Sequence, residues 1–163
     1  FGLDFTVYWS GYYRISPDIQ LHYDAIRFTQ LCQNGEIAPP LEAELLLTQA
    51  VNLYRGDFLA SSSAAWVEQR RWELKQTYAD ALCSLANLKT DKGLMREGLG
   101  LYLRALSIEA REDIAVNAMQ LYSELGQPQE ALEVYQWYER KTASLQIAPQ
   151  VSALAEVLRT QTA

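Results

Sequence analysis

Apolar residues recur at intervals of three and four along most of the chain after Pro17, the spacing that places them on one face of an α-helix. The longest such pattern, over 61–93, has an apolar face several turns long, which must be buried against a neighbour. The sequence predicts helices over 22–35, 41–54, 64–90, 95–108, 111–125, 128–144 and 148–160, the last being a capping helix. We expect Ser63 to cap the start of the longest helix.

The first residues follow a different pattern. FTVYWSGYYRIS (5–16) is aromatic and β-branched on both sides of Ser10-Gly11, which predicts two short strands joined by a tight turn. A two-stranded hairpin is barely stable alone, so we expect it to pack on another part of the protein. Because the chain opens on Phe1 rather than Met, we interpret residues 1–21 as the end of a preceding domain and residues 22–163 as the helical domain.

The second half of the chain repeats itself. GLMREGLGLY begins at Gly93 and GQPQEALEVY at Gly126, and 126 − 93 = 33 residues; the same shift pairs Gly98 with Ala131. A period of about 34 residues is the length of a tetratricopeptide helix–turn–helix unit. One such unit leaves an apolar face uncovered, so the units must stack. We therefore predict an all-α fold, a tetratricopeptide-like right-handed stack of antiparallel helix hairpins with a short N-terminal β-hairpin and a C-terminal capping helix.

The triplet Arg55-Gly56-Asp57 occurs in integrin ligands, but here it lies between apolar residues. The helical pattern of 41–54 ends just before it, and glycine readily adopts the left-handed conformation of a helix C-terminal cap. An adhesion sequence belongs on an exposed loop, usually in a secreted protein. We expect Gly56 to terminate the helix, and adhesion is the alternative.

Composition limits the partners of this chain. Its 163 residues carry 14 Lys and Arg against 20 Asp and Glu, a net charge of −6. Negative charge opposes the phosphate backbone of nucleic acids, so we do not expect direct DNA binding. No apolar run approaches the ~20 residues of a membrane span, and no signal sequence is recognisable, which predicts a cytoplasmic location.

Residue types that carry catalysis are few and dispersed. His22 is the single histidine, and no motif links it to a serine or cysteine, so we interpret it as structural. Cys32 and Cys83 lack the paired spacing of a zinc or redox site and are expected to be buried, reduced thiols. The sequence thus predicts no catalytic site, no metal and no cofactor. A small helical enzyme is the third hypothesis, after the two binding functions given below.

One helix carries a basic cluster, Arg70, Arg71 and Lys75, interspersed with Glu68 and Glu73. The cluster could contact phosphate or an acidic partner. Because both glutamates lie within helical pairing distance, a lattice of internal salt bridges is the favoured interpretation.

Several segments together, in order and spacing, resemble the bacterial transcriptional activator domain. They are LYRGDFL (53–59), AWVEQRRWEL (65–74), GQPQEALEVYQWYER (126–140) and SLQIAPQVSALAEVL (144–158). This family is the tetratricopeptide-like module that follows a winged-helix DNA-binding domain in regulators of the antibiotic-regulatory-protein type. GYYRIS (11–16) is similar to the family's junction with the winged helix. Two features depart from the family pattern: Gln146 stands where glycine is usual, and no winged-helix recognition helix precedes the hairpin.

The resemblance implies a regulatory protein–protein interaction module of a bacterial transcription regulator. Such a module would position an attached domain, mediate self-association or contact another protein such as RNA polymerase, and would reach DNA only through a domain outside this chain. The alternative is a generic tetratricopeptide scaffold attached to a signalling or sensor domain. A helix-turn-helix pattern upstream would favour the first hypothesis, and a catalytic motif upstream the second.

The repeat register also predicts where a partner binds. In tetratricopeptide-like stacks, outward positions on the first helix of each unit line a concave groove that holds peptides or partner helices. Here these positions are Asp80, Asn87 and Thr90 in one unit and Asp113, Gln120 and Ser123 in the next. Since this set holds two acids and no lysine or arginine, we expect a neutral or basic partner segment. Occupation by the chain itself or by a second copy is the alternative.

Overall fold

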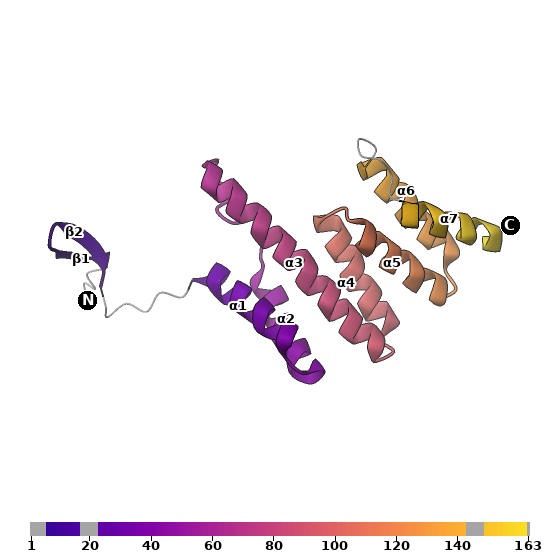
Figure 1. The fold of residues 1–163 in the computed structure, drawn as a ribbon, viewed down its shortest axis with the longest axis horizontal. Coiled ribbons are helices and arrows are strands. Elements are labelled where there is room, and N and C mark those ends of the chain that lie inside the picture. Colours follow the sequence, from indigo (N-terminus) through magenta and orange to yellow (C-terminus); the bar gives the residue numbers. More distant parts are fainter. Residues whose placement is uncertain (1–5, 17–22, 143–148, 163) are drawn as a thin grey trace.

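The computed structural model of the chain describes residues 6–16, 23–142 and 149–162, in which a two-stranded hairpin precedes seven helices (Figure 1). The strands are β1 (Thr6–Trp9) and β2 (Tyr12–Ile15), and the helices are α1 (Asp24–Ile37), α2 (Pro40–Leu53), α3 (Ala65–Asp91), α4 (Met95–Ile108), α5 (Glu112–Glu124), α6 (Pro128–Thr142) and α7 (Pro149–Thr162). The predicted all-α, tetratricopeptide-like architecture is confirmed, and each predicted helix is present with its described ends shifted by one or two residues at most.

The helices pack as consecutive antiparallel pairs that follow one another along the molecule (Figure 1). α1 packs on α2, α3 on α4 and α5 on α6, while contacts of α2 with α3 and of α4 with α5 join one pair to the next. α7 covers both α5 and α6, as a capping helix should. A continuous apolar core runs through the stack and includes the fully buried Leu47, Leu82, Ile114 and Leu158.

The two repeat units turn by the same backbone motif. Gly93 and Gly126 have φ of 77° and 72°, values that glycine adopts without a Cβ clash. Each glycine amide donates to the carbonyl three residues before it, and the next amide donates to the carbonyl five residues before it. This is the Schellman arrangement that ends a helix. The sequence period of 33 residues is therefore also a period of backbone geometry.

Close approach of α4 to α3 depends on Gly98. A Cβ atom at this position would lie 2.5 Å from Cγ2 of Thr90 and 3.1 Å from the carbonyl oxygen of Ala86. One turn further along α4, the buried Tyr102 donates a hydrogen bond of 2.5 Å to Oδ1 of Asn87 on α3. The absence of a side chain at Gly98 is thus what allows the two helices to meet.

Two carboxylates link helices through residues that are far apart in sequence. Glu44 of α2 pairs with Lys89 at 2.9 Å and with Lys92, and hydrogen bonds from these two lysines hold the pKa of Glu44 below its usual value. Oε1 of Glu112 on α5 accepts hydrogen bonds of 2.9 and 3.3 Å from two amides in the first turn of α7. Its negative charge also faces the positive end of the α7 dipole, so Glu112 stabilises the docking of the capping helix.

The predicted hairpin is confirmed. β1 and β2 pair antiparallel, with Trp9 opposite Tyr12 across a two-residue turn. Ser10 and Gly11 have φ of 49° and 89°, and two positive values are typical of the type I′ turn that suits the twist of paired strands. That the hairpin packs on another part of the protein stays a prediction.

The predicted cap of the longest helix is wrong. α3 starts after Ala64, and no side chain caps its first turn. The hydroxyl of Ser62, rather than that of Ser63, accepts a hydrogen bond of 3.4 Å from the amide of Ala64. The carbonyl of Ser62 is also bound by Arg71 at 3.0 Å, which fixes the path of the chain into α3.

The predicted role of Gly56 as a helix terminator is also wrong. α2 ends before Tyr54, which takes the C-cap position with an extended backbone. The ring of Tyr54 stacks on that of Tyr78 in α3 at 4.0 Å between centroids, and this contact accounts for the early departure from the helix. Gly56 lies in the following loop with φ of 151°.

Candidate partner-binding groove

A polar cavity of about 280 Å³ lies between α3 and α5, on the face that the repeat register predicts. It is lined by Asn87, Thr90, Asp91, Met95, Tyr102, Asn117, Gln120, Leu121 and Glu124. Three of the six predicted residues, Asn87, Thr90 and Gln120, therefore lie together in one cavity.

A second cavity of similar volume, about 280 Å³, extends this surface toward α1 and α2. Its lining includes Glu36, Ser84 and Asn87, and Asn87 also lines the first cavity. The two cavities share Asn87, and we call them together the polar groove; their lining comes from α1 and α2, from α3 and α4, and from α5. This is the surface that a peptide or a helix occupies in stacks of this kind.

Asn87 is held in one orientation at the junction of the two cavities. Its Oδ1 accepts the hydrogen bond from Tyr102, and its carbonyl accepts one of 2.9 Å from the hydroxyl of Thr90. Burial raises the pKa of Tyr102 to about 12, so the phenol remains a donor at neutral pH. With its carbonyl oxygens engaged, Asn87 presents its amide NH₂ group to a ligand.

Asp80 and Asp113 do not line the polar groove, which corrects the predicted charge of the site. Arg111 lies between them, with Nη1 at 2.5 Å from Asp80 and Nη2 at 2.7 Å from Asp113. The hydrogen bonds raise the pKa of Arg111 and lower that of Asp113. Their charges are neutralised internally by Arg111. The 33-residue shift maps Arg111 onto Tyr78, so the repeat offered no counterpart to reveal it.

Two acidic residues that sequence reasoning missed do line the groove. Asp91 and Glu124 are the last residues of α3 and α5, are exposed, and belong to no ion pair among the described residues. The signal was present, since 124 − 91 = 33, the repeat period. Ser123, by contrast, does not line the groove; its carbonyl accepts the turn amide of Gly126 at 2.9 Å.

Among the described residues, no group of three or more His, Cys, Asp or Glu side chains is arranged to hold a metal ion. Both cysteines are free thiols; Cys32 is buried, as predicted, whereas Cys83 is half-buried. Burial raises the pKa of Cys32 to about 12 and that of Cys83 to about 11, which leaves both thiols protonated and unreactive at neutral pH. His22 lies outside the described residues.

The basic cluster of α3 forms the predicted salt bridges. Arg70 pairs with Glu73 at 3.1 Å and Arg71 with Glu68 at 2.8 Å, whereas Lys75 reaches out to Asp57 at 3.1 Å. These pairs leave the cluster compensated rather than free to bind phosphate.

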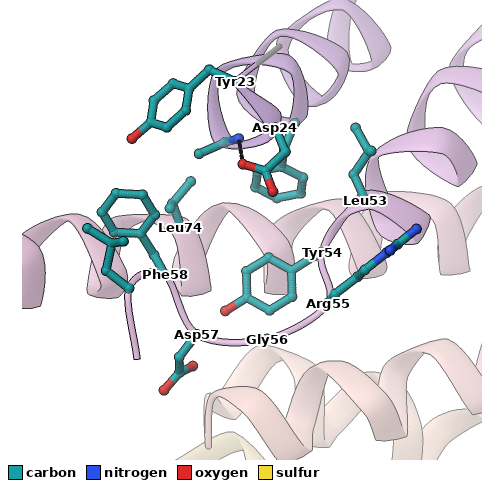
Figure 2. A pocket seen from close by; sticks show the side chains of 12 residues that line it. Tyr23, Asp24, Leu53, Tyr54, Arg55, Gly56, Asp57, Phe58 and Leu74 are labelled. Atoms are coloured by element: carbon teal, nitrogen blue, oxygen red, sulfur yellow. Dashed lines mark hydrogen bonds between the residues drawn. The ribbon is translucent and has the colours of Figure 1, made fainter. Parts of the chain in front are cut away.

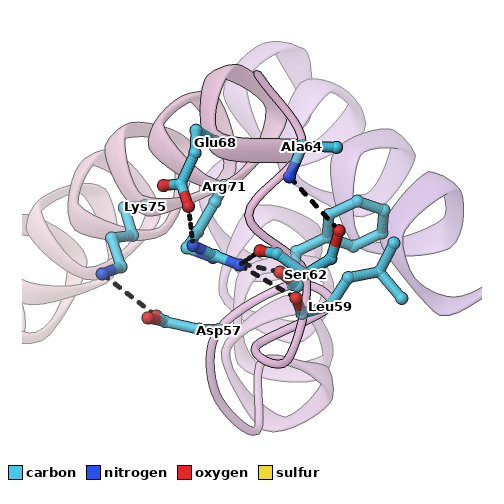
Figure 3. A network of polar contacts seen from close by, with 8 residues as sticks. Asp57, Leu59, Ser62, Ala64, Glu68, Arg71 and Lys75 are labelled. Carbon is cyan, nitrogen blue, oxygen red and sulfur yellow. Dashed lines mark hydrogen bonds and ion pairs between the residues drawn. The ribbon is translucent and has the colours of Figure 1, made fainter. Parts of the chain in front are cut away.

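Arg71 also organises the loop that joins α2 to α3 (Figure 3). Its guanidinium donates to the carbonyls of Phe58 at 3.1 Å, Leu59 at 2.9 Å and Ser62 at 3.0 Å. Leu59 has a positive φ of 44°, a conformation that is strained for leucine and that these bonds hold in place. In the triplet before it, Asp57 is paired with Lys75, so the carboxylate that an integrin ligand must present is engaged within the domain.

Comparison with known families supplies the context for this groove. Residues 23–157 match the family model described as the bacterial transcriptional activator domain. A search of curated proteins finds no significant match. In the part of the chain that the structure describes, no helix is long and apolar enough to cross a membrane.

Proposed function

Because the chain belongs to the bacterial transcriptional activator domain family, a module of transcription regulators, we propose that it acts by binding a protein segment in the polar groove. The observation that carries this proposal is a pair of adjoining cavities that share Asn87, whose amide is fixed, with acids around them that form no ion pair with a described residue. A short polypeptide, extended or helical, matches this shape.

The charge of the groove indicates the chemistry of its partner. Glu36, Asp91 and Glu124 line it, and no lysine or arginine does so among the described residues. A neutral or basic segment would be attracted, and an acidic one repelled. We therefore propose a neutral or basic partner segment, attracted by these three acids rather than by Asp80 and Asp113, which are paired with Arg111.

We further propose that the chain has no catalytic activity of its own and does not itself bind DNA. The net charge of −6 opposes contact with phosphates, and the basic residues of α3 are engaged in ion pairs. DNA would be reached through a domain outside this chain, to which residues 1–21 would form the junction. A regulator of transcription works beside the chromosome, so we place the chain in the cytoplasm.

A reporter experiment tests the proposal. The chain is fused to a DNA-binding domain of known site, and transcription from a promoter carrying that site is measured. We expect the fusion to activate transcription, and the double variant Asn87→Trp, Gln120→Trp, which fills the groove, to lose most of that activation. The isolated chain should not retard DNA in a gel. The molar mass measured by light scattering shows whether the chain self-associates, as it must if a second copy occupies the groove. Undiminished activation by the filled groove, or retardation of DNA by the isolated chain, would contradict the proposal.

A further inference from the structure

A third cavity lies where the start of α1 faces the loop after α2 (Figure 2), and it shares no lining residue with the polar groove. Its volume is about 410 Å³, within the range of about 300–1,000 Å³ that accommodates small ligands and side chains. We call it the aromatic cleft, since Tyr23, Phe28, Tyr54 and Phe58 are among its lining residues. The cleft is not used by the function proposed above.

The ring of Tyr54 lines the aromatic cleft. One face of Tyr54 lies on Tyr78 at 4.0 Å with an interplanar angle of 10°. The guanidinium of Arg104 lies over the Tyr78 ring, 5.3 Å from its centroid. Figure 2 shows the Tyr54 ring lying across the cleft. The Tyr54 ring therefore offers an aromatic surface to a ligand in the cleft, and the contact of Arg104 with Tyr78 shows that a guanidinium already lies over a tyrosine ring in this domain.

A carboxylate stands beside that surface. Asp24, in the first turn of α1, accepts a hydrogen bond of 2.8 Å from the amide of Ala25 through Oδ1, and Figure 2 shows its carboxylate directed toward the cleft. Asp24 forms no ion pair with any described residue. Its second oxygen is free to accept from a ligand.

The other charged residues that line the aromatic cleft are Asp57, which forms an ion pair, and Arg55, which points away from the Tyr54 ring. Asp57 pairs with Lys75 through one carboxylate oxygen, at 3.1 Å. The pKa of Tyr54 is raised by burial and then by the negative charge of Asp57, so this charge is felt within the cleft. The side chain of Arg55 points away from the Tyr54 ring (Figure 2). Of the two carboxylates that line the cleft, Asp24 is therefore the one that forms no ion pair with a described residue.

We propose that the aromatic cleft binds the guanidinium group of an arginine side chain presented by a partner polypeptide. A guanidinium is flat, stacks on an aromatic face and donates two parallel hydrogen bonds to a carboxylate, so one group satisfies both Tyr54 and Asp24. A lysine ammonium lacks the flat surface, and a neutral aromatic ring leaves Asp24 unpaired. The net charge of −6 also draws basic segments toward the chain.

A titration followed by nuclear magnetic resonance tests this proposal. N-acetyl-arginine amide is added to the ¹⁵N-labelled chain, with N-acetyl-lysine amide and N-acetyl-norleucine amide as comparison ligands. The arginine derivative should shift the amides of Asp24, Tyr54 and Gly56 saturably, with a dissociation constant in the millimolar range expected for one side chain. The lysine derivative should bind several-fold more weakly, and the norleucine derivative should produce no saturable shift at these amides.

Matched variants locate the interaction. Asp24→Asn removes the charge from an exposed residue and should weaken arginine binding about ten-fold, as should Tyr54→Leu, whereas Tyr54→Phe keeps the flat ring and should bind nearly as the parent does. Asp91→Asn in the polar groove should change nothing, which separates this site from the groove. Equal shifts with norleucine, unchanged affinity in Asp24→Asn, or no saturable shift at all would overturn the proposal. Free L-arginine should bind no more tightly than the blocked derivative; tighter binding would exclude a polypeptide as the source.

Discussion

Replacing Gly98 by alanine tests how closely α3 and α4 approach one another. The new Cβ would lie 2.5 Å from Cγ2 of Thr90 and 3.1 Å from the carbonyl oxygen of Ala86, whereas carbon contacts are ordinarily longer than about 3.5 Å. The carbonyl belongs to the α3 backbone and cannot rotate away. Overpacking of this kind costs about 1–3 kcal/mol of the free energy of unfolding.

Gly100 on the same helix provides a matched control. A Cβ at Gly100 meets no atom within 4 Å, so Gly100→Ala gains about 0.8–1.0 kcal/mol of helix propensity without a clash. The same propensity gain applies to Gly98→Ala, so it cancels when the two variants are compared. The difference between them should therefore equal the overpacking cost, with Gly98→Ala about 1–3 kcal/mol less stable than Gly100→Ala.

Urea denaturation followed by circular dichroism at 222 nm measures both variants. Adding Thr90→Ser to Gly98→Ala removes Cγ2 and should recover part of the loss. The contact with the Ala86 carbonyl remains at 3.1 Å, so recovery should be incomplete. If Gly98→Ala were as stable as Gly100→Ala, α3 and α4 would not approach as closely as described, and the steric account of the repeat would be refuted.

Other substitutions and conditions test separate parts of the domain. The Arg71→Lys variant can keep only some of the hydrogen bonds that the guanidinium donates to three carbonyls. It should therefore lower the free energy of unfolding by about 1–3 kcal/mol in urea denaturation. An unchanged midpoint of the urea transition would contradict the role of Arg71. Glu112→Ala should speed amide hydrogen exchange throughout α7 by the equivalent of about 1–2 kcal/mol while exchange in α3 stays the same, and uniform or absent changes would argue against the cap. Iodoacetamide at pH 8 should alkylate Cys32 and Cys83 at least about 100-fold more slowly than free cysteine, because their pKa values are raised to about 12 and about 11; rapid labelling of either thiol would contradict its raised pKa. The pKa of Asp113 is lowered by Arg111, so the stabilisation is present above the unfolded pKa and is lost as pH falls through the folded pKa. The exposed pair should make Asp113→Asn less stable by about 0.5 kcal/mol at pH 7, and this difference should vanish in acid once the pH is below the folded pKa; its persistence there would contradict an ionic origin.

The architecture could be predicted from sequence because it rests on local periodicity. The spacing of apolar residues locates every helix, and the 33-residue shift between Gly93 and Gly126 predicts a shared turn, which the structure shows as the same pair of hydrogen bonds. The hairpin follows from Ser10-Gly11, whose positive φ values allow strands to reverse direction in two residues. Helix ends were less predictable, since Tyr54 leaves α2 to stack on a residue 24 positions later.

The candidate sites were predictable only in part. Register alone placed Asn87, Thr90 and Gln120 in one groove, because helical position determines which face a residue occupies. The salt bridge from Arg111 to Asp80 joins residues that are 31 apart in sequence and meet only in the fold. It could not be predicted from the repeat, because the 33-residue shift pairs Arg111 with Tyr78. The aromatic cleft likewise brings the start of α1 against a loop some thirty residues further along, which local patterns do not reveal.

Charge reversal in the polar groove tests the central claim most directly. Asp91 and Glu124 are the last residues of their helices, where a cation suits the helix dipole, so Asp91→Lys, Glu124→Lys should fold at least as stably as the parent. In the reporter fusion this double variant is compared with Glu42→Lys, Glu156→Lys, which makes the same change of net charge at exposed sites that line neither described groove cavity. We predict that the groove reversal abolishes activation while the control retains it. Equal activation by the two variants would contradict the proposal that this groove is where the domain binds its partner.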